Sequence, residues 1–347
     1  MNNKFGRELR RFRIRLTKYE FWPWWLFFLP LFPFYLYFAI RLRNPVYFTA
    51  ANPGIDLGGF FGEKKNEIMK ELPEQFLAKS LFFEEVDWEV VQSGLLKSQL
   101  TFPIVFKPDV GERGDEVSII PGLDALRTHL ASITYPFILQ EYIDYPIELG
   151  VFYSRLPSSD SGRILSIVQK KFLSVIGDGT STVEKLIKSN DRGFLQLPRL
   201  RRERLETLAL IPTKGRSIVV EPIGNHCLGT EFINANHLIS EKLNKVFDEI
   251  SLPFEGFYYG RYDLRIKSID EMSEGKGIRI FELNGVTSEP GHIYDKKINI
   301  FQAYMDLIQQ QRVVYQICRQ NLSKDGQVTK LPEVLKRAYQ HFFKSKR

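Results

Sequence analysis

Cysteine and histidine are scarce in this sequence of 347 residues, which holds two cysteines and five histidines. Cys227 and Cys318 lie far apart, so they offer neither a disulfide framework nor a paired-cysteine zinc site, and a reducing compartment, the cytoplasm, fits best. No Ser-His-Asp or Cys-His arrangement is recognisable, which argues against a mechanism with a nucleophilic side chain. A composition of 44% hydrophobic and 26% charged residues is ordinary for a folded, mostly soluble protein of about two domains.

Most of the chain carries no net positive charge. The net charge is +7, and residues 1–43 alone hold nine basic and two acidic residues, so the remainder is neutral. A nucleic-acid-binding domain needs its basic excess spread over a binding face. We therefore expect no nucleic-acid partner, and we expect residues 1–43 to contact anionic membrane lipid.

An uncharged apolar run follows the basic tail, from residue 21 to residue 40. About 20 apolar residues can span a bilayer as one helix. The run holds three prolines, Pro23, Pro30 and Pro33, and prolines within a helix kink it. A single span after a basic tail would also place everything beyond Arg43 outside the cell. We expect a re-entrant helix-break-helix on the cytoplasmic side of the cell membrane, with a transmembrane span or a buried aromatic hairpin as alternatives.

The rest of the chain predicts an α+β fold. Residues 44–100 are expected to form a short lead-in region with a glycine-rich turn near 58–62. Over 101–325, short β-rich runs alternate with turn signals, which is typical of largely antiparallel sheets. Residues 326–347 predict a basic amphipathic helix, more often packed on its own domain than on a membrane. Further helices are expected over residues 63–72, 123–132 and 181–189, and an exposed loop over 199–204.

Two segments indicate contacts to a nucleotide. FPIVFKPDVGERGDEVSII is a strand that ends near Lys107, a loop with Gly111 and Gly114, and a second strand. Glycine lets backbone N–H groups approach phosphate oxygens, and the lysine adds a charge-assisted contact. In FILQEYIDYPIELGVFY, Glu141 or Glu148 could accept hydrogen bonds from ribose hydroxyls. Plain β-hairpins with exposed acidic residues are the alternative interpretation of both segments.

The strongest local signal is a pair of apolar strands, YYGRYDLRIKS and GIRIFELNG. The first carries Asp263, and the second carries Glu282 and Asn284, which lie two residues apart and so point to the same face. Adjacent strands in register would bring the three side chains together. Magnesium takes oxygen ligands of this kind, and two buried carboxylates without a cation would be unfavourable by several kcal/mol. We therefore expect a magnesium site, with manganese as an alternative metal.

These motifs together resemble the ATP-grasp superfamily. An arginine two residues before the aspartate, and ELNG before VTSEPG, are similar to the pattern of D-alanine:D-alanine ligase. SVIGDGTSTVEKLI resembles the GDG-x-ST segment of cyanophycin synthetase and related amino-acid ligases. The resemblance covers roughly residues 60–310. It is carried by Lys107, the loop 111–114, Glu141, Glu148, Arg261, Asp263, Glu282 and Asn284.

The resemblance implies an ATP-grasp fold, in which two α+β subdomains clamp ATP. It implies that Arg261 stabilises the transferring phosphoryl group, and that Asp263, Glu282 and Asn284 hold the metal. A second strand lysine is implied at Lys170 or Lys171, and a weaker phosphate contact at Lys64 or Lys65. The implied nucleotide-binding residues are Lys107, Gly111, Gly114, Gln140, Glu141, Tyr142, Ile143, Glu148 and Lys171.

The implied reaction joins a small carboxylate and an amine at the expense of ATP, through an acyl phosphate. A non-catalytic nucleotide-binding or regulatory protein of the same fold at the membrane is the alternative. His226, Ser288 and Glu289 are candidate substrate contacts, although a structural role is the commoner explanation of each. Only a short region separates the apolar run from the central strands, so a standard cytoplasmic dipeptide ligase is not expected. The acceptor is expected to be linked to the membrane or delivered there.

Overall fold

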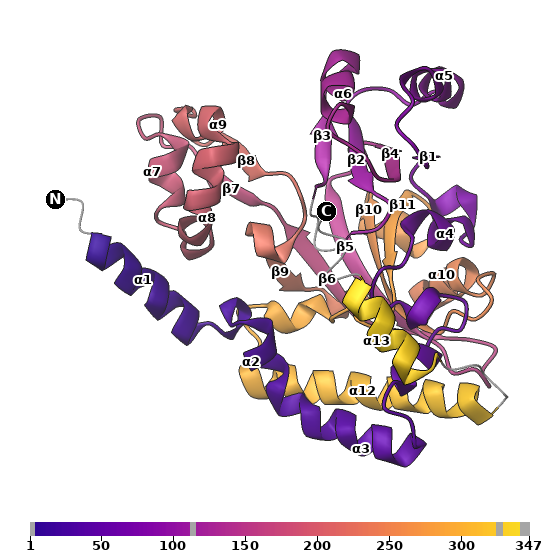
Figure 1. Ribbon diagram of the computed structural model, residues 1–347. Helices are drawn as coiled ribbons and strands as arrows, with labels where there is room; N and C mark the ends of the chain where they lie inside the picture. The colour runs from indigo at the N-terminus through magenta and orange to yellow at the C-terminus, as the bar shows by residue number, and fades with distance from the viewer. Residues whose placement is uncertain (1–3, 112–115, 324–328, 341–347) are drawn as a thin grey trace. The chain divides into compact units, whose positions relative to one another are not determined.

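The computed structural model describes residues 4–111, 116–323 and 329–340 (Figure 1). The chain divides into two compact units. The first unit comprises residues 1–35, 169–234 and 291–308, and the second comprises residues 36–168, 235–290 and 309–347. Three sheets with antiparallel pairs and the helices around them confirm the expected α+β class.

A four-stranded sheet of the second unit follows the order β1-β4-β2-β3. Its strands are β1 (Ser80–Phe83), β2 (Ile104–Pro108), β3 (Ser118–Ile120) and β4 (Phe137–Glu141). Helices α5 (Trp88–Ser98) and α6 (Leu123–Leu130) pack on it through buried leucine and valine side chains (Figure 1). The Asp87 side chain begins α5 by accepting hydrogen bonds from the backbone N–H groups of Glu89 and Val90. Strand β1 comes from the stretch expected to be a lead-in region.

The larger sheet has the order β11-β10-β5-β6-β9. Its strands are β5 (Ile147–Ser154), β6 (Arg163–Lys171), β9 (Glu231–Asn234), β10 (Tyr259–Ile266) and β11 (Ile278–Asn284). In β10, Tyr262, Leu264 and Ile266 point into the core beneath the sheet, where they meet α10 (Glu241–Ser251). Successive side chains on a strand alternate between faces, so the polar residues of β10 occupy the other face. That face carries the candidate site.

The first unit contains a two-stranded sheet of β7 (Leu173–Ile176) and β8 (Ser217–Glu221). Three helices cover it: α7 (Val183–Ile187), α8 (Asp191–Glu203) and α9 (Leu205–Ala209). Between β7 and α7, the GDG segment forms a turn in which Asp178 Oδ1 accepts from the N–H groups of Thr180, at 2.8 Å, and Ser181, at 2.6 Å. These hydrogen bonds hold the pKa of Asp178 well below its usual range. The resemblance to cyanophycin synthetase therefore falls on a segment with a clear structural role.

Helices predicted over 63–72, 123–132 and 181–189 are present as α4 (Lys65–Lys70), α6 and α7. The exposed loop predicted over 199–204 is wrong, because residues up to Glu203 belong to α8. Leu197 and Leu200 are buried on one side of that helix, and Arg199 binds the buried carboxylate of Glu221 at 2.7 Å. The arginines of this stretch suggested an exposed loop, although Leu197 and Leu200 recur at helical spacing. Pro198, which disfavours a helix interior, also argued against a helix.

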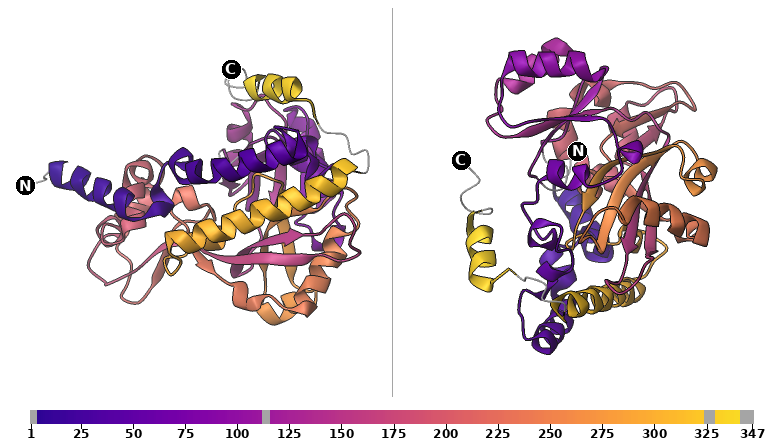
Figure 2. Two further views of the ribbon diagram at one scale, coloured as in Figure 1. Left: turned by 90° about the horizontal axis from the view of Figure 1, so that it is seen from below. Right: turned by 90° about the vertical axis from the view of Figure 1, so that its right-hand side faces the viewer.

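The apolar run forms α2 (Trp24–Phe28), a 3-10 turn over Leu29–Leu31 and α3 (Phe32–Leu42). By length and composition, Trp24–Leu42 is the one helix among the described residues that could cross a membrane, and 22% of it is buried. The expected break near Pro30 and Pro33 does not reverse the chain (Figure 2). Each proline lies in the first turn of a helical element, where its missing N–H group has no intrahelical partner to lose.

Two helices close the chain, α12 (Ile300–Ser323) and α13 (Leu331–Tyr339). Val334 of α13 is buried against Val46, Leu57 and Phe61 of the same unit. The helix predicted at the carboxyl terminus therefore packs on its own unit. Phe342 and Phe343, which the prediction also included, lie outside the described residues.

Candidate nucleotide and metal site

The antiparallel register of β10 and β11 brings the three expected metal ligands together. Asp263 lies directly opposite Glu282, and Arg261 lies opposite Asn284. The Asn284 amide nitrogen donates to Asp263 Oδ2 at 3.2 Å. For metal binding, the Asn284 side chain would turn its oxygen toward Asp263 in place of its nitrogen. The register therefore confirms that the two strands are adjacent and that these side chains share a face.

Asp263 is 2% exposed, and its negative charge is matched by one arginine. The Nε and Nη2 atoms of Arg261 donate to the two Asp263 oxygens at 3.2 and 3.0 Å. Arg261 Nη1 also donates to the Glu289 carbonyl oxygen at 3.1 Å. A buried carboxylate needs such a partner or a metal ion. The arrangement fits a site in which a cation and Arg261 share Asp263.

The space beside Asp263 depends on a glycine of β5. Gly150 is the partner of Asp263 in the β5–β10 register. A Cβ atom at Gly150 would lie 3.3 Å from Asp263 Oδ1 and 3.3 Å from Arg261 Cδ. The chain therefore leaves room at the carboxylate that any other residue would fill. Two carboxylates, one amide and this room fit a magnesium ion. Among the described residues, no cluster of three or more His, Cys, Asp or Glu side chains offers another metal site.

Lys107 of β2 contacts β11 at a β-bulge. The register shifts after Asp263, because Asp263 pairs with Glu282 and Leu264 pairs with Ile280, so Phe281 is the extra residue. Its carbonyl oxygen accepts a hydrogen bond from Lys107 Nζ at 2.7 Å. Lys107 also donates to the Gln140 side chain at 3.2 Å. Burial lowers the pKa of Lys107 to about 8, so the ammonium group lies at the site partly desolvated.

The predicted adenine and ribose residues surround a second arginine, Arg265. Its Nε donates to Glu148 at 2.9 Å, and its Nη1 donates to the Ile143 carbonyl at 2.6 Å. Its guanidinium lies 5.7 Å from the Tyr142 ring centroid. Glu141 is held separately, 3.6 Å from Arg279. Arg265 was not among the predicted residues, although it lies two residues from Asp263 on the same strand and therefore on the same face. The roles of Gln140, Glu141, Tyr142, Ile143 and Glu148 toward a nucleotide stay predictions.

The glycine loop begins after Asp109, and the structure describes it as far as Gly111. Asp109 accepts from the N–H of Asn66 at 2.8 Å, and its carbonyl accepts from the N–H of Lys65 at 3.1 Å. The Lys65 ammonium donates to the Gly111 carbonyl. Gly114 lies outside the described residues. Of the two lysines left open by the sequence, Lys65 contacts the loop, while Lys64 pairs with Glu67 at 2.8 Å.

The loop that follows Asn284 is clamped by the glycine-rich turn. The Gly58 carbonyl accepts from Val286 N–H at 3.1 Å, and the Gly59 carbonyl accepts from the Thr287 hydroxyl at 3.1 Å. Gly59 has a φ of +77°, and a Cβ atom there would meet the Gly285 Cα at 2.6 Å. Only glycine allows both this backbone conformation and this approach. The glycine-rich turn was predicted from the sequence, but its contact with Gly285 was not.

Gly59→Ala should lower the free energy of unfolding by about 2–4 kcal/mol and reduce turnover, because two backbones must separate beside Asn284. Gly215 is the matched control, with a φ of +83° and open space around the added Cβ. Gly215→Ala keeps the conformational strain without the collision, and we expect a loss near 1 kcal/mol. Chemical denaturation measures both. Equal losses would show that the Gly59–Gly285 contact is unimportant.

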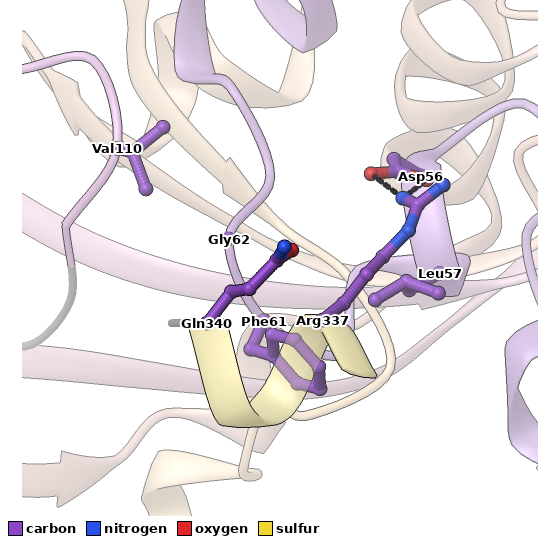
Figure 3. Close-up of a pocket in the computed structure, with 7 residues that line it drawn as sticks. All are labelled: Asp56, Leu57, Phe61, Gly62, Val110, Arg337 and Gln340. Atoms are coloured by element: carbon purple, nitrogen blue, oxygen red, sulfur yellow. Dashed lines mark hydrogen bonds and ion pairs between the residues drawn. The ribbon is translucent and has the colours of Figure 1, made fainter. Parts of the chain in front are cut away.

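A pocket of about 290 Å³ lies beside this turn (Figure 3). Its walls come from the turn (Leu57, Phe61 and Gly62), from Val110 at the start of the glycine loop, and from α13. At one edge, Arg337 Nη1 donates to both Asp56 carboxylate oxygens at 2.6 Å. The pocket therefore has a mostly apolar wall and, at its edge, one arginine and one aspartate that are paired with each other.

The other residues predicted to contact ATP or a substrate lie in both units. Lys170 is buried and Lys171 is exposed, on opposite faces of β6 in the first unit. In the same unit, the His226 ring lies 4.7 Å from that of Tyr294, and its Nε2 lies 3.6 Å from Glu20. Ser288, in the second unit, donates to the Asn284 carbonyl at 2.8 Å, which gives it a structural role in the loop. The assignments of Lys171 and His226 to substrates stay predictions.

The sequence matches no protein-family model and no curated protein. In structure, the chain is similar to a D-alanine–D-alanine ligase from Bacillus anthracis, with a TM-score of 0.41 and 12% identity, covering 76% of this chain and 69% of that one. It is similar to a bifunctional glutathione synthetase from Pasteurella multocida (TM-score 0.38, 16% identity), covering 71% of this chain and 36% of that one. It is similar to the ATP-grasp ligase PsnB complexed with minimal precursor (TM-score 0.36, 12% identity), covering 69% and 56%. All three are ligases or synthetases by name, and this chain spans 36% to 69% of their lengths.

Proposed function

We propose that the protein is an ATP-grasp ligase that uses ATP and magnesium to join a small carboxylate to an amine. The observation that carries this proposal is the strand register that sets Asp263 opposite Glu282, with Asn284 and Arg261 as the neighbouring pair. Two carboxylates, an amide and a guanidinium on one sheet face form a set suited to a metal ion and a phosphate chain. The buried ammonium of Lys107 donates to the carbonyl oxygen of Phe281, the residue before Glu282.

Each residue has a task that its contacts support. A magnesium ion held by Asp263, Glu282 and Asn284 would offset the charge of the ATP phosphates. Arg261 can turn from Asp263 toward the γ-phosphate and bind the oxygens on which charge accumulates. Lys107 can exchange its carbonyl partner for a phosphate oxygen.

The proposed reaction has two steps. A substrate carboxylate oxygen attacks the γ-phosphorus, which forms an acyl phosphate and releases ADP. The amine nitrogen then attacks the acyl carbon, phosphate leaves, and the amide forms with loss of one proton. Neither step needs a nucleophilic side chain, because positioning and charge compensation supply the catalysis.

The test has two stages. Purified protein is heated with ATP and magnesium, and we expect a higher melting temperature than with either alone. ADP release is then measured across pairs of amino acids and small carboxylates. Stimulated ADP release with formation of an amide supports a ligase. ATP binding without stimulated release supports the alternative, a nucleotide-binding protein of the same fold. Absence of any ATP-dependent shift would refute both.

ATP affinity should fall as pH rises through about 8. Lys107 is protonated below its pKa of about 8 and neutral above it, so the contact to phosphate weakens as the proton leaves. We expect a loss of about tenfold in affinity between about pH 7.5 and 9.5, measured by titration calorimetry with MgATP. Lys107→Met should bind weakly with no such trend. Lys65→Met, at the glycine loop, should keep it, and a flat wild-type profile would count against the Lys107 contact.

We also propose that the protein works at the cytoplasmic side of the cell membrane, where residues 1–43 bind lipid. The basic excess of these residues and the exposed apolar side chains of α2 support this location. Fractionation of cells into soluble and membrane portions tests it. Recovery of the intact protein wholly in the soluble portion would exclude it.

A further inference from the structure

The amino-terminal helix α1 (Lys4–Thr17) carries an exposed apolar stripe. Phe5, Leu9, Phe12 and Leu16 recur at intervals of three and four residues, so they lie on one side of the helix. Their exposed fractions are 74%, 56%, 64% and 62%. Four large apolar side chains in a row on one helix are unusual for a surface in contact with water alone.

The opposite side of α1 is attached to the first unit. Ile14, half a turn out of phase with the stripe, is 4% exposed and packs in the core with Phe194. Arg10 donates to Asp191 at 2.9 Å, and its guanidinium lies 4.3 Å from the Phe194 ring centroid. Lys18 donates to the other Asp191 oxygen at 3.0 Å. These contacts fix the helix with its apolar stripe turned outward.

Exposed positive charge borders the stripe. Arg13 and Arg15 lie on its two sides, and both are exposed. Across the described part of the chain, neither arginine forms an ion pair with an acidic side chain. An apolar stripe between unpaired arginines is complementary to an anionic lipid surface, in which phosphate groups border hydrocarbon.

The next helix has the same two-sided character within the first unit. Phe27 and Leu31 are buried against Ile293 and Leu307, and the Tyr304 hydroxyl donates to the Phe27 carbonyl at 3.0 Å. The exposed large apolar residues between Trp24 and Phe32 are Trp24, Trp25, Leu26, Leu29 and Phe32. A helix attached lengthwise to its own unit cannot cross a bilayer without carrying the exposed polar groups of that unit into hydrocarbon.

We propose that α1 and the segment from Trp24 to Phe32 insert side-on into one leaflet of an anionic bilayer, parallel to its surface, and that Trp24–Leu42 does not span it. The stripe of α1 enters the acyl region while Arg13 and Arg15 bind lipid phosphates, and the two tryptophans lie at headgroup depth. This proposal rests on the membrane association proposed above and is independent of the ligase chemistry. This geometry differs from the re-entrant segment that the prolines led us to expect. It also adds apolar insertion to the electrostatic contact with lipid that was expected of α1.

Vesicle flotation of the full chain tests the stripe. The vesicles contain phosphatidylcholine alone or equal parts of phosphatidylcholine and phosphatidylglycerol. We expect binding to the anionic vesicles, and a reduction on the order of 100-fold in partitioning for Leu9→Glu with Phe12→Glu. The uncharged pair Leu9→Gln with Phe12→Gln should also lose at least about tenfold, because it removes apolar burial while leaving the charge unchanged.

The matched control is Gly6→Glu with Thr17→Glu, two exposed positions of α1 away from the stripe. It adds the same negative charge, so a purely electrostatic attachment would make both glutamate pairs equally weak. That outcome would overturn the insertion of α1 and leave the membrane association standing. Failure of the wild-type chain to bind anionic vesicles would instead refute the membrane association itself. Circular dichroism verifies that each variant is folded.

Depth distinguishes side-on insertion from a span. Lipids brominated near the headgroup or near the end of the acyl chain quench tryptophan fluorescence at those depths. The reporter is Phe32→Trp, near the middle of Trp24–Leu42, in a chain whose four native tryptophans are replaced by phenylalanine. Side-on insertion keeps this residue in the outer part of one leaflet, so we expect stronger quenching by the shallow bromines. Stronger quenching by the deep bromines would overturn side-on insertion in favour of a helix that crosses the bilayer.

Discussion

Asp263→Asn is expected to abolish magnesium-dependent ADP release, with a loss on the order of 100-fold or more. The substitution removes the negative charge that the metal site and Arg261 share, while the shape of the side chain is kept. Loss of about 3 kcal/mol of charge stabilisation in the transition state corresponds to that factor. Glu282→Gln, on the facing register position, should give a loss of the same kind. Steady-state ADP release at saturating ATP measures both.

A matched control lies seven residues along the chain. Asp270 is an exposed aspartate in the short helix Ile269–Ser273, and Asp270→Asn makes the same chemical change away from the site. We expect this variant to keep the wild-type rate within about twofold. Turnover by Asp263→Asn at the rate of the Asp270 control would remove the metal assignment. The melting temperature without nucleotide shows whether a lost rate reflects unfolding.

The metal ligands could be predicted because they follow from local rules. Glu282 and Asn284 are two residues apart on a strand, and Asp263 lies on the strand before it in the chain. Alternation of side chains and the tendency of successive strands to pair place all three on one face. Lys107 could be predicted as a strand-end lysine. Its partner could not, because the Phe281 carbonyl contacts Lys107 at a one-residue register shift that sequence periodicity does not reveal.

Long-range contacts explain most of what sequence analysis missed. Glu148 was predicted as an acceptor for ribose, and its ion pair with Arg265 joins residues 117 positions apart. The Gly59–Gly285 approach joins two segments of backbone, to which no side-chain pattern applies. In α1, the charge of the arginines drew attention away from apolar residues at helical spacing. That stripe was readable from the sequence, whereas the side that α1 turns to its own unit was not.

Asn52→Leu is the substitution expected to destabilise the second unit most. Asn52 is fully buried, and its amide nitrogen donates to the carbonyls of Gly58, at 3.0 Å, and Tyr259, at 2.8 Å. Its oxygen accepts from the N–H groups of Tyr258 and Tyr259, both at 2.9 Å. One side chain thus ties the glycine-rich turn to the start of β10. Leucine would remove four hydrogen bonds to backbone groups, of which the Gly58 carbonyl keeps its bond from the Val286 N–H, so we expect a loss of about 3–5 kcal/mol in unfolding free energy.

Asn44→Leu provides the comparison, because the Asn44 side chain accepts one hydrogen bond, from the Val46 N–H at 2.8 Å, and should lose only about 1 kcal/mol. Urea denaturation followed by tryptophan fluorescence measures both variants. Since Gly58 also holds the loop after Asn284, Asn52→Leu should weaken ATP-dependent stabilisation at temperatures where the protein is still folded. Equal losses for the two variants would mean that water or a shifted backbone replaces the Asn52 contacts. In that case the Asn52 side chain would not be what holds the glycine-rich turn beside the metal ligands.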